Sequence, residues 1–417
     1  MPPAPVVGRT DTAVFTLVAG TATIAPVVDV VSRAFADPAV PIATIIVPPA
    51  VVADNVRVEM PHTLINAAAA DPKPLRIEAP AFTVQLPEQI FRLPVIVDAV
   101  GAGRPFSLNL AANDVTVAAA PAVTAAVAVL PDAPAYSPPL QVFQLALTVD
   151  APGVPARNIR DFGGGIVDFG ALYTNAELAA AAVADERVLN FYRFADNALQ
   201  PQLTWVDSGA NRATGWFHGF SRFALIAYQR SFTDIVGHWS QSHVELMAAK
   251  HIIRGVDAVN FDPERNISRA EFAALLQRTV GLREAVGDPV FRDVRPAAWY
   301  FGAVQAAAAA GLVKGYDGEF RPAAAISRQE MAVMMARALD RLGVQVDLTQ
   351  AQVDSSLAGF ADRDAISEWA REAVSVTVTF GIVRGRTATT FAPTANATRA
   401  ESATMLQRTV ESAGLLK

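Results

Sequence analysis

Short runs of alternating apolar and polar residues fill the first part of the chain. Pro, Gly and Asn-Asp turns separate these runs, of which clear examples are residues 55–60, 75–78, 82–86, 106–110 and 143–149. Because successive side chains of a strand point to opposite faces of a sheet, this period of two predicts half-buried strands. Many short strands with frequent turns are typical of a β-sandwich. We therefore predict an all-β sandwich region, with one module over residues 1–150 and a second module, or a continuation of the first, over 151–230.

Four further segments of this region are interpreted separately. Two alanine-rich patches, residues 63–70 and 175–184, predict short helices that connect strands. The segment 115–130 contains Ala, Val and Thr with a single proline and a final leucine, and we interpret it as part of the strand pattern. Residues 15–24 alternate apolar residues with Thr, Ala and Gly, which predicts a further strand.

Aromatic residues gather in the last four predicted strands of the region, residues 188–194, 203–206, 214–217 and 223–228. These strands predict a four-stranded meander. Their aromatic residues fit either a platform for sugar rings or a core with cross-strand ring pairs. The rings occupy the alternate positions that a buried face requires, so a core is the favoured interpretation.

After Phe232 the apolar residues recur every three or four positions, which predicts amphipathic helices and a boundary near residues 229–231. This part contains one motif three times, beginning at Phe232, Phe291 and Phe360: Phe-x-Asp, Trp, Ile/Leu-x-x-Gly, Phe-x-Pro and Ser/Thr-Arg-x-Glu. In every copy the Trp and the Gly are 16 residues apart, and the Pro and the Arg are 6 residues apart. Such fixed spacing indicates a structural repeat.

Each copy of the motif predicts a helix, a loop and a second helix. Two amphipathic helices cannot bury both of their apolar faces alone, so the copies need one another. We predict an all-α bundle with approximate threefold symmetry, built from repeats at 231–286, 290–343 and 359–417.

The Ser/Thr-Arg-x-Glu motif has the spacing of a helix capping box. In such a box the hydroxyl and the carboxylate accept hydrogen bonds from backbone donors of the first turn, which explains the Ser/Thr and the Glu. The box does not explain the arginine, because the helix dipole disfavours a cation in the first turn. An arginine beside free helix amides suits a small anion such as a carboxylate. The alternative is an arginine that is solvated or paired with the aspartate of the Phe-x-Asp motif.

Two further motif positions have a structural and a functional interpretation. The three tryptophans fit either a core, which we favour, or the wall of a sugar-binding groove. The glycines Gly255, Gly315 and Gly385 fit a helix exit with positive φ. The basic residue before each glycine is favourable at a helix C-terminus and needs no ligand.

The repeated motif resembles the S-layer homology domain of bacterial cell-surface proteins, over residues 232–413. The resemblance implies a three-pronged spindle around a central three-helix bundle, whose grooves bind secondary cell-wall polysaccharide, often at a pyruvylated terminal sugar. It therefore implies an extracellular protein that is anchored without a covalent bond to the cell wall or the S-layer. The motif positions to which the resemblance assigns binding are Asp234, Trp239, Arg269, Asp293, Trp299, Arg328, Asp362, Trp369 and Arg399.

The copies depart from the family pattern in places. Gln329 stands where alanine is usual, and Ala397 replaces the apolar Ile of the other two copies. We expect the three grooves to differ in occupancy, and the first copy to keep the family pattern best.

Composition removes several other functions. The net charge of −6 gives no basic surface for nucleic acid. The chain has no cysteine, which excludes disulfides, thiolate metal sites and cysteine nucleophiles. The five histidines include one close pair, His238 and His243, whose spacing of five does not place both on one helix face. We expect no metal and no cofactor.

The hydrophobic fraction of 52% does not produce a membrane segment. No stretch of 18 apolar residues lacks charges or turn residues, so we expect no membrane insertion. The first residues also lack the basic cluster and apolar core of an export signal. For a surface protein, the simplest account is a truncated or misassigned start.

The leading hypothesis is therefore a non-enzymatic surface protein held by its C-terminal repeats, with other surface-layer subunits among its expected partners. One alternative is a wall-anchored enzyme that acts on polysaccharide, for which Asp161 and Asp168 are the only acids that we would test. A third hypothesis is a self-assembling subunit of the S-layer itself.

Overall fold

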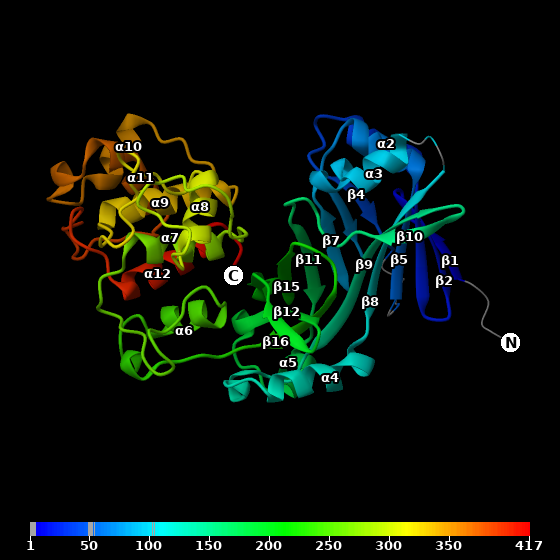
Figure 1. The fold of residues 1–417 in the computed structure, drawn as a ribbon, viewed down its shortest axis with the longest axis horizontal. Coiled ribbons are helices and arrows are strands. Elements are labelled where there is room, and N and C mark those ends of the chain that lie inside the picture. Colours follow the sequence, from blue (N-terminus) through cyan, green and yellow to red (C-terminus); the bar gives the residue numbers. More distant parts are fainter. Residues whose placement is uncertain (1–5, 49–52, 54, 102, 104) are drawn as a thin grey trace. The chain divides into compact units, whose positions relative to one another are not determined.

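The chain forms two compact units, Met1–Tyr228 and Gln229–Lys417 (Figure 1). The computed structural model describes residues 6–48, 53, 55–101, 103 and 105–417. The division falls beside the change from alternating to helical pattern at residues 229–231. Both sheets of the first unit contain strands from before and after residue 150, and the division of this unit at that residue stays a prediction.

The first unit is strand-rich and contains two sheets. Within its described residues the larger sheet has the order β1-β2-β3-β5-β8-β9-β16-β12-β13, with β10 paired to β9, and the smaller has the order β14-β15-β11-β7-β6-β4. The strands are β1 (Val6–Arg9), β2 (Ala13–Val18), β3 (Thr21–Pro26), β4 (Ala43–Ile46), β5 (Asn55–Pro61), β6 (Leu75–Glu78), β7 (Phe82–Leu86), β8 (Ser107–Asp114), β9 (Gln141–Ala151), β10 (Val154–Asn158), β11 (Val167–Leu172), β12 (Leu189–Ala195), β13 (Ala198–Pro201), β14 (Thr204–Asp207), β15 (Arg212–Phe217) and β16 (Arg222–Ala227).

Alternation is a reliable guide to these strands. In β5, Val56, Val58 and Met60 are buried while the residues between them are not, as the period of two requires. The expected strand at 15–24 is instead a hairpin of β2 and β3. Ala19 and Gly20 have positive φ and reverse the chain, which divides the apolar run in two.

The expected four-stranded meander does not form one sheet. β12 and β16 pair with each other in the larger sheet, whereas β14 and β15 pair in the smaller one. Ring contacts join the two sheets: Phe169 and Phe217 of the smaller sheet both contact Phe191 of the larger. All three rings are buried, which confirms the core interpretation of the aromatic residues. The sandwich as a whole stays a prediction.

The first unit also contains helices between its strands. The helices in its described residues are α1 (Val28–Ala36), α2 (His62–Ala70), α3 (Pro94–Gly101), α4 (Thr116–Ala128) and α5 (Asn175–Ala180), with short 3₁₀ turns η1 (Glu88–Arg92), η2 (Ala133–Ala135), η3 (Glu186–Val188) and η4 (Ser208–Ala210). The two expected helical patches correspond to α2 and α5, so both predictions are confirmed. An all-β description is too narrow for a unit with these helices.

The assignment of 115–130 to the strand pattern is wrong, because this segment forms helix α4. Its buried residues Ala119, Val123, Ala126 and Val127 follow the helical period of four and three. Asp114, which precedes the N-cap residue Val115, accepts hydrogen bonds from the backbone N–H and hydroxyl of Thr116, the first residue of the helix. High alanine content outweighed the proline inside the helix.

The second unit is helical, and each repeat contributes two main helices. The first helices are α6 (Gln241–Ala249), α8 (Phe301–Ala309) and α11 (Glu368–Thr379). The second helices are α7 (Arg269–Thr279), α9 (Arg328–Arg341) and α12 (Arg399–Ser412). The remaining elements are α10 (Gln350–Leu357), η5 (Thr233–Ile235) and η6 (Arg363–Ala365).

The repeats pack in cyclic order. The second helix of each repeat packs on the first helix of the next: α7 on α8, α9 on α11, and α12 on α6. Three backbone hydrogen bonds close the same ring, from Ile326 to Ile267, from Ala397 to Ile326 and from Ile267 to Ala397. The threefold symmetry of the unit stays a prediction. Within the described part of the chain, no helix has the length and apolar character that a membrane crossing needs.

Candidate functional site

Each second helix begins with the predicted capping box. At Ser268, Ser327 and Thr398 the hydroxyl accepts a hydrogen bond from the backbone N–H three residues later. The glutamate at that third position, Glu271, Glu330 or Glu401, accepts a bond from the N-cap backbone. The structural interpretation of these positions is confirmed.

The arginine of the same motif links one repeat to the next. The Arg269 side chain donates from Nε to the Phe320 carbonyl (2.8 Å), and its guanidinium contacts the Glu330 carboxylate (2.7 Å). A third bond, to the Lys314 carbonyl, is 3.2 Å long. The arginine of the first repeat therefore holds the loop and the capping glutamate of the second repeat.

The other two arginines repeat this contact around the ring. Arg328 bonds to the Phe391 and Arg384 carbonyls at 2.9 and 2.6 Å and contacts Glu401 at 2.5 Å. Arg399 bonds to the Phe261 and Arg254 carbonyls at 2.8 and 2.7 Å.

The helix amides beside these arginines are not free. The backbone N–H groups of Arg269 and Ala270 bond to Ala324 and Pro322 of the next repeat, and the equivalent pairs in the other repeats do the same. The prediction of an anion pocket made from free helix amides is therefore wrong, because the neighbouring loop supplies the acceptors. The alternative of a solvated arginine is also wrong, because the side chains of Arg269, Arg328 and Arg399 are only 11%, 2% and 11% exposed. This burial lowers the pKa of all three.

The motif aspartates shape the loop that each arginine reaches. Asp234 accepts hydrogen bonds from the backbone N–H groups of Phe261 and Asp262, and Asp293 and Asp362 bind the same two positions of their own repeats. The middle residue of each Phe-x-Pro segment has positive φ, as at Asp262, so the aspartate stabilises a left-handed turn. Although burial raises it, these backbone donors lower the pKa of Asp362 overall.

The motif tryptophans lie on the surface, so the prediction that they form core is wrong. Trp239, Trp299 and Trp369 expose 58%, 63% and 60% of their area. Each stands at the start of the first helix of its repeat, just before α6 and α8 and inside the first turn of α11. Rings with this exposure are available for stacking.

The motif glycines are also explained differently. Gly255, Gly315 and Gly385 are not in the left-handed region; the helix exits use His251, Gly311 and Gly381 instead. A Cβ on Gly315 would lie 2.5 Å from the Glu319 carbonyl oxygen and 2.6 Å from the Phe291 ring. The glycine is therefore required by close packing rather than by its φ angle.

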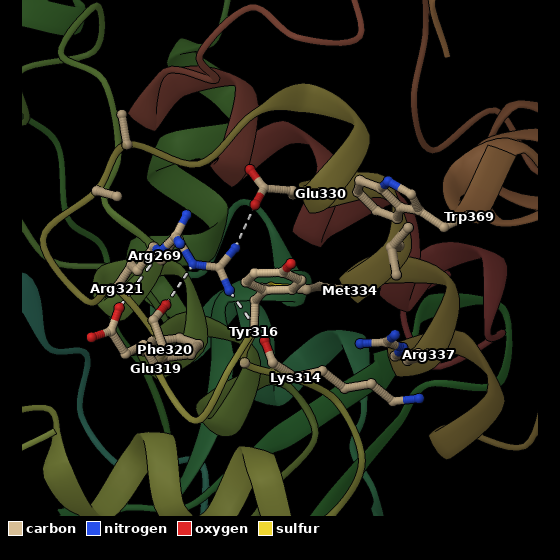
Figure 2. A pocket seen from close by; sticks show the side chains of 14 residues that line it. Arg269, Lys314, Tyr316, Glu319, Phe320, Arg321, Glu330, Met334, Arg337 and Trp369 are labelled. Carbon is tan, nitrogen blue, oxygen red and sulfur yellow. Dashed lines mark hydrogen bonds and ion pairs between the residues drawn. The ribbon is translucent and has the colours of Figure 1, made fainter. Parts of the chain in front are cut away.

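Two grooves of the second unit bring the arginines and the exposed tryptophans together. The first groove, of about 760 Å³, is lined by Arg269, Lys314, Glu330, Met334, Arg337 and Trp369 among others (Figure 2). The second groove, of about 550 Å³, is lined by the equivalent residues Arg328, Arg384, Glu401, Met405, Arg408 and Trp239. Each groove takes its arginine from one repeat, its wall from the next and its tryptophan from the third.

The model of one protein family matches this unit three times, at residues 231–273, 290–332 and 359–403, and that family is the S-layer homology domain. The second unit contains three S-layer homology domains. The predicted membership of its repeats is thereby confirmed.

Curated relatives share part of the chain. It is 33% identical over 210 residues to an amylopullulanase of Thermoanaerobacterium thermosulfurigenes, a match over 50% of this chain and 11% of that protein. It is 31% identical over 192 residues to the surface-layer 125 kDa protein of Lysinibacillus sphaericus (45% of this chain, 15% of that one). A cellulosome-anchoring protein of Acetivibrio thermocellus is 29% identical over 164 residues (38% and 35%). The matches thus span about a tenth to a third of these relatives.

The sequence analysis missed a second arginine in each S-layer homology domain, and two of these arginines, Arg337 and Arg408, line the grooves. Arg278, Arg337 and Arg408 each follow the motif arginine by nine residues, and each donates to the carbonyl of the Ile/Leu that begins the Ile/Leu-x-x-Gly motif. Burial lowers the pKa of all three. Their constant spacing was the available signal. Lys314 and Arg384, interpreted as helix caps from sequence, also line the grooves.

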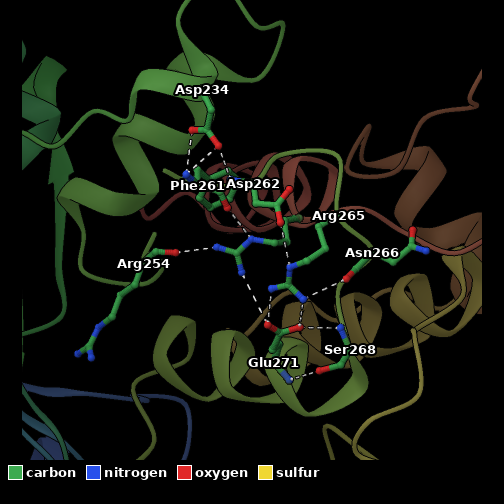
Figure 3. Close-up of polar contacts among 9 residues, drawn as sticks. Asp234, Arg254, Phe261, Asp262, Arg265, Asn266, Ser268 and Glu271 are labelled. Atoms are coloured by element: carbon green, nitrogen blue, oxygen red, sulfur yellow. Dashed lines mark hydrogen bonds and ion pairs between the residues drawn. The ribbon is translucent and has the colours of Figure 1, made fainter. Parts of the chain in front are cut away.

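Arg399 reaches the first S-layer homology domain at the third equivalent position. The ion pair at this position is different and joins Arg265 to Glu271 (Figure 3). Arg265 contacts Glu271 at 2.6 Å, and the Arg399 guanidinium is 3.9 Å from the same carboxylate. The residues equivalent to Arg265 are Ala324 and Ala395. The three positions are therefore not chemically equal.

Asp161 and Asp168, the two acids considered for a hydrolase site, make different contacts in the first unit. Asp161 accepts a hydrogen bond from the Gly163 backbone at 3.1 Å. Asp168 lies in β11 between Gln85 and Trp216 of the flanking strands. Burial raises the pKa of Asp168 to about 6, and the charge of Arg76 opposes this shift.

Proposed function

We propose that the three S-layer homology domains hold this protein to the cell wall by binding an anionic secondary cell-wall polysaccharide, with a pyruvylated sugar as the preferred group. The domains are non-catalytic, and together with relatives named as S-layer and cellulosome-anchoring proteins they indicate an extracellular, cell-wall-associated protein. The strand-rich first unit is the part that the anchor displays.

The observation that carries this proposal is the composition of the two grooves. Each combines several cations with an exposed indole, at the motif positions of Trp369 and Trp239. Sugar rings stack on exposed aromatic faces, and carboxylates pair with arginine and lysine. A carbohydrate that bears a carboxylate satisfies both features.

In this proposal the motif arginines have a structural role in the groove, rather than the direct contact with an anion that the sequence suggested. Arg269 and Arg328 use at least three donors on the neighbouring repeat, so their main contribution is to hold the groove wall in place. The Arg269 and Arg328 side chains are only 11% and 2% exposed, so little of either guanidinium is left to contact a ligand directly. The motif aspartates contribute by fixing the loop that the arginine contacts.

A wall-anchored hydrolase is the second candidate. Relatives named amylopullulanase, exoglucanase, endoglucanase and xylanase match part of this chain. The specific observation in its favour is Asp168, whose pKa of about 6 is that of a proton donor near neutral pH. Release of reducing sugar from starch, cellulose or xylan by the full chain, and its loss in Asp168→Asn, would establish this activity. A subunit of the S-layer, the third candidate, would instead self-assemble into sheets after purification.

Retention on purified cell-wall sacculi tests the anchoring proposal. We expect the full chain to sediment with sacculi, and the double variant Trp239→Ala, Trp369→Ala to stay in solution. Both tryptophans are more than half exposed, so their removal does not open the core. Val286→Ala, at a residue that is 94% exposed, is the matched control and should sediment as before.

Chemical removal of pyruvyl groups from the sacculi separates the polysaccharide from its acidic group. Loss of sedimentation on treated sacculi supports recognition of the ketal. Unchanged sedimentation after both the treatment and the tryptophan substitutions contradicts the proposal.

A further inference from the structure

The third equivalent position differs from the two grooves in the cation that its capping glutamate contacts. In the two grooves the motif arginine contacts the capping glutamate of the next repeat at 2.7 and 2.5 Å. At the third position the Arg399 guanidinium is 3.9 Å from Glu271, whereas the Arg265 guanidinium is 2.6 Å from the same carboxylate. Arg265 therefore takes the place on this carboxylate that the motif arginine has in the grooves.

Arg265 is held in this place by its own repeat. A second nitrogen of its guanidinium lies 3.3 Å from the other oxygen of Glu271 and 3.4 Å from the Asn266 carbonyl, and Nε is 3.5 Å from the Asp262 carboxylate. Figure 3 shows the Arg265 guanidinium directed at Glu271. Contacts within one repeat thus fix this side chain, and none of them needs a ligand.

The positions that these contacts join are lining positions of an open groove. Their equivalents in the second repeat all line the first groove: Arg321, Ala324 and Glu330. At Ala324 the side chain ends at Cβ, and that groove has a volume of about 760 Å³. At the third position an arginine starts from this wall and ends on the capping glutamate, so its side chain crosses the space that the first groove leaves open.

A second arginine near the capping glutamate does not close a groove by itself. Arg386 lies 3.5 Å from Glu401, yet the second groove has a volume of about 550 Å³. There Arg328 keeps its contact with Glu401, so Arg386 is an additional partner. Arg399 has lost the equivalent contact, and its pKa is lowered by burial and also by the nearby charge of Arg265. Arg265 thus replaces the motif arginine at this contact, rather than joining it.

We infer that Arg265 closes the third position to wall polysaccharide, so that the unit binds through two sites although it has three repeats. Trp299, which is 63% exposed, is the tryptophan that the cyclic order of the repeats assigns to the closed position. This inference rests on the proposed function, because it states which of the equivalent positions bind the polymer.

Fluorine NMR of the full chain labelled with 5-fluorotryptophan tests the inference. Trp369 reports on the first groove, Trp239 on the second and Trp299 on the third position, and Trp→Phe variants assign the three signals among the five tryptophans. The probe is a methyl hexoside that carries a 4,6-O-pyruvyl ketal. In the wild-type protein the Trp239 and Trp369 signals should shift during the titration, whereas the Trp299 signal should not.

Arg265→Ala should open the third position. The Trp299 signal should then shift with the probe, with a dissociation constant within about tenfold of those in the two grooves, because the element that excluded the ligand is gone. Arg399 remains near Glu271 as its cation, and the shifts of the other two signals show that the variant is folded. Arg363→Ala, at a surface arginine that lines neither groove, is the matched control and should leave the Trp299 signal unchanged.

The reverse exchange tests the same inference in the first groove. The double variant Arg321→Asp, Ala324→Arg copies the acid and the arginine of the third position into this groove. It should raise the dissociation constant at Trp369 at least about tenfold and leave that at Trp239 unchanged. Arg321→Asp alone is the control and should weaken binding at Trp369 less than the double variant does.

The outcomes separate this inference from the proposed function. If the wild-type Trp299 signal shifts as the other two do, or stays unchanged in Arg265→Ala while they shift, this inference is wrong and anchoring stands. The inference is also wrong if the double variant binds at Trp369 as tightly as Arg321→Asp does. If none of the three wild-type signals responds to the probe, the proposed function of the grooves is itself contradicted.

Discussion

At the residue scale, the motif arginine at the start of each second helix connects neighbouring repeats through hydrogen bonds. The planar guanidinium bonds to two carbonyls in each repeat, and Arg269 and Arg328 also bond to a carboxylate. Each guanidinium lies 4.5–5.3 Å from the centroid of the loop phenylalanine ring. Arg328 is 2% exposed, so this charge is stable only while its partners surround it. The same residue thus determines both the stability of the ring and the shape of a groove.

Arg328→Ala should strongly destabilise the second unit. The substitution leaves a cavity and deprives the 14% exposed Glu401 of its closest cation, and losing one partner of a buried pair costs about 3 kcal/mol or more. Arg328→Lys should also destabilise the second unit, because a lysine ammonium cannot reach the two carbonyls and the Glu401 carboxylate in the planar geometry of a guanidinium. Urea unfolding measures both. Arg292→Ala, at a 61% exposed surface pair, should change stability by less than about 0.5 kcal/mol; an equal effect of the two alanine variants would contradict this account.

Asp168 should make the first unit less stable at neutral pH than at mildly acidic pH. Its folded pKa of about 6 lies above its usual value of 3.8, so between these values the folded state holds the proton more firmly. The stability contribution therefore falls as pH rises through about 6. Comparing thermal unfolding of wild type and Asp168→Asn from about pH 4 to 7 isolates this residue, since other carboxylates are common to both. Parallel pH curves would contradict the prediction.

The site was predictable at those residues whose role is local. A capping box needs only its own four residues, and its spacing in the sequence is enough to identify it. Tryptophan exposure and arginine partners depend on which repeat lies beside which, and spacing within one repeat contains no such information. The sequence also suggested positive φ at Gly315, whereas the close approach of Phe291 explains that glycine.

At the element scale, helix α4 shows how two sequence signals compete. Valine favours a strand and Pro121 argues against a helix interior, while alanine content and the spacing of Ala119, Val123 and Ala126 favour a helix. Strand existence was predicted well because alternation is local. The sheet to which each strand belongs was not predicted, because it depends on contacts between segments that are distant in sequence. β14 and β15, for example, pair in the smaller sheet, whereas β12 and β16 pair in the larger one.

Pro121→Ala should stabilise the first unit. Pro121 lies inside α4 and lacks the N–H that would bond to the preceding turn, while its side chain is exposed and packs on no core. Replacing an interior helix proline with alanine recovers about 1–3 kcal/mol. Ala122→Gly, at the next exposed position, is the opposite control and should cost about 1 kcal/mol. Chemical denaturation followed by circular dichroism measures both, and no gain from Pro121→Ala would contradict the helical assignment of this segment.

At the scale of the whole molecule, the cyclic order of the repeats has a consequence for binding. Each groove needs residues from all three repeats, so no repeat can form a groove alone. The ring nevertheless presents two grooves within one rigidly packed unit. A polymer with many acceptor sugars can therefore engage both grooves at once.

Retention on sacculi should fall more than additively when both grooves are altered. With one groove intact, as in Trp239→Ala or Trp369→Ala, the protein still binds a dense polymer, and its dissociation should accelerate about tenfold. With both tryptophans replaced, the benefit of simultaneous binding is lost as well, and dissociation should accelerate by a further 100-fold or so. Washout of labelled full-length protein from sacculi measures these rates, with soluble monosaccharide binding as the monovalent comparison. Strictly additive losses in free energy would show that the two grooves act independently on the wall, even if each of them binds sugar.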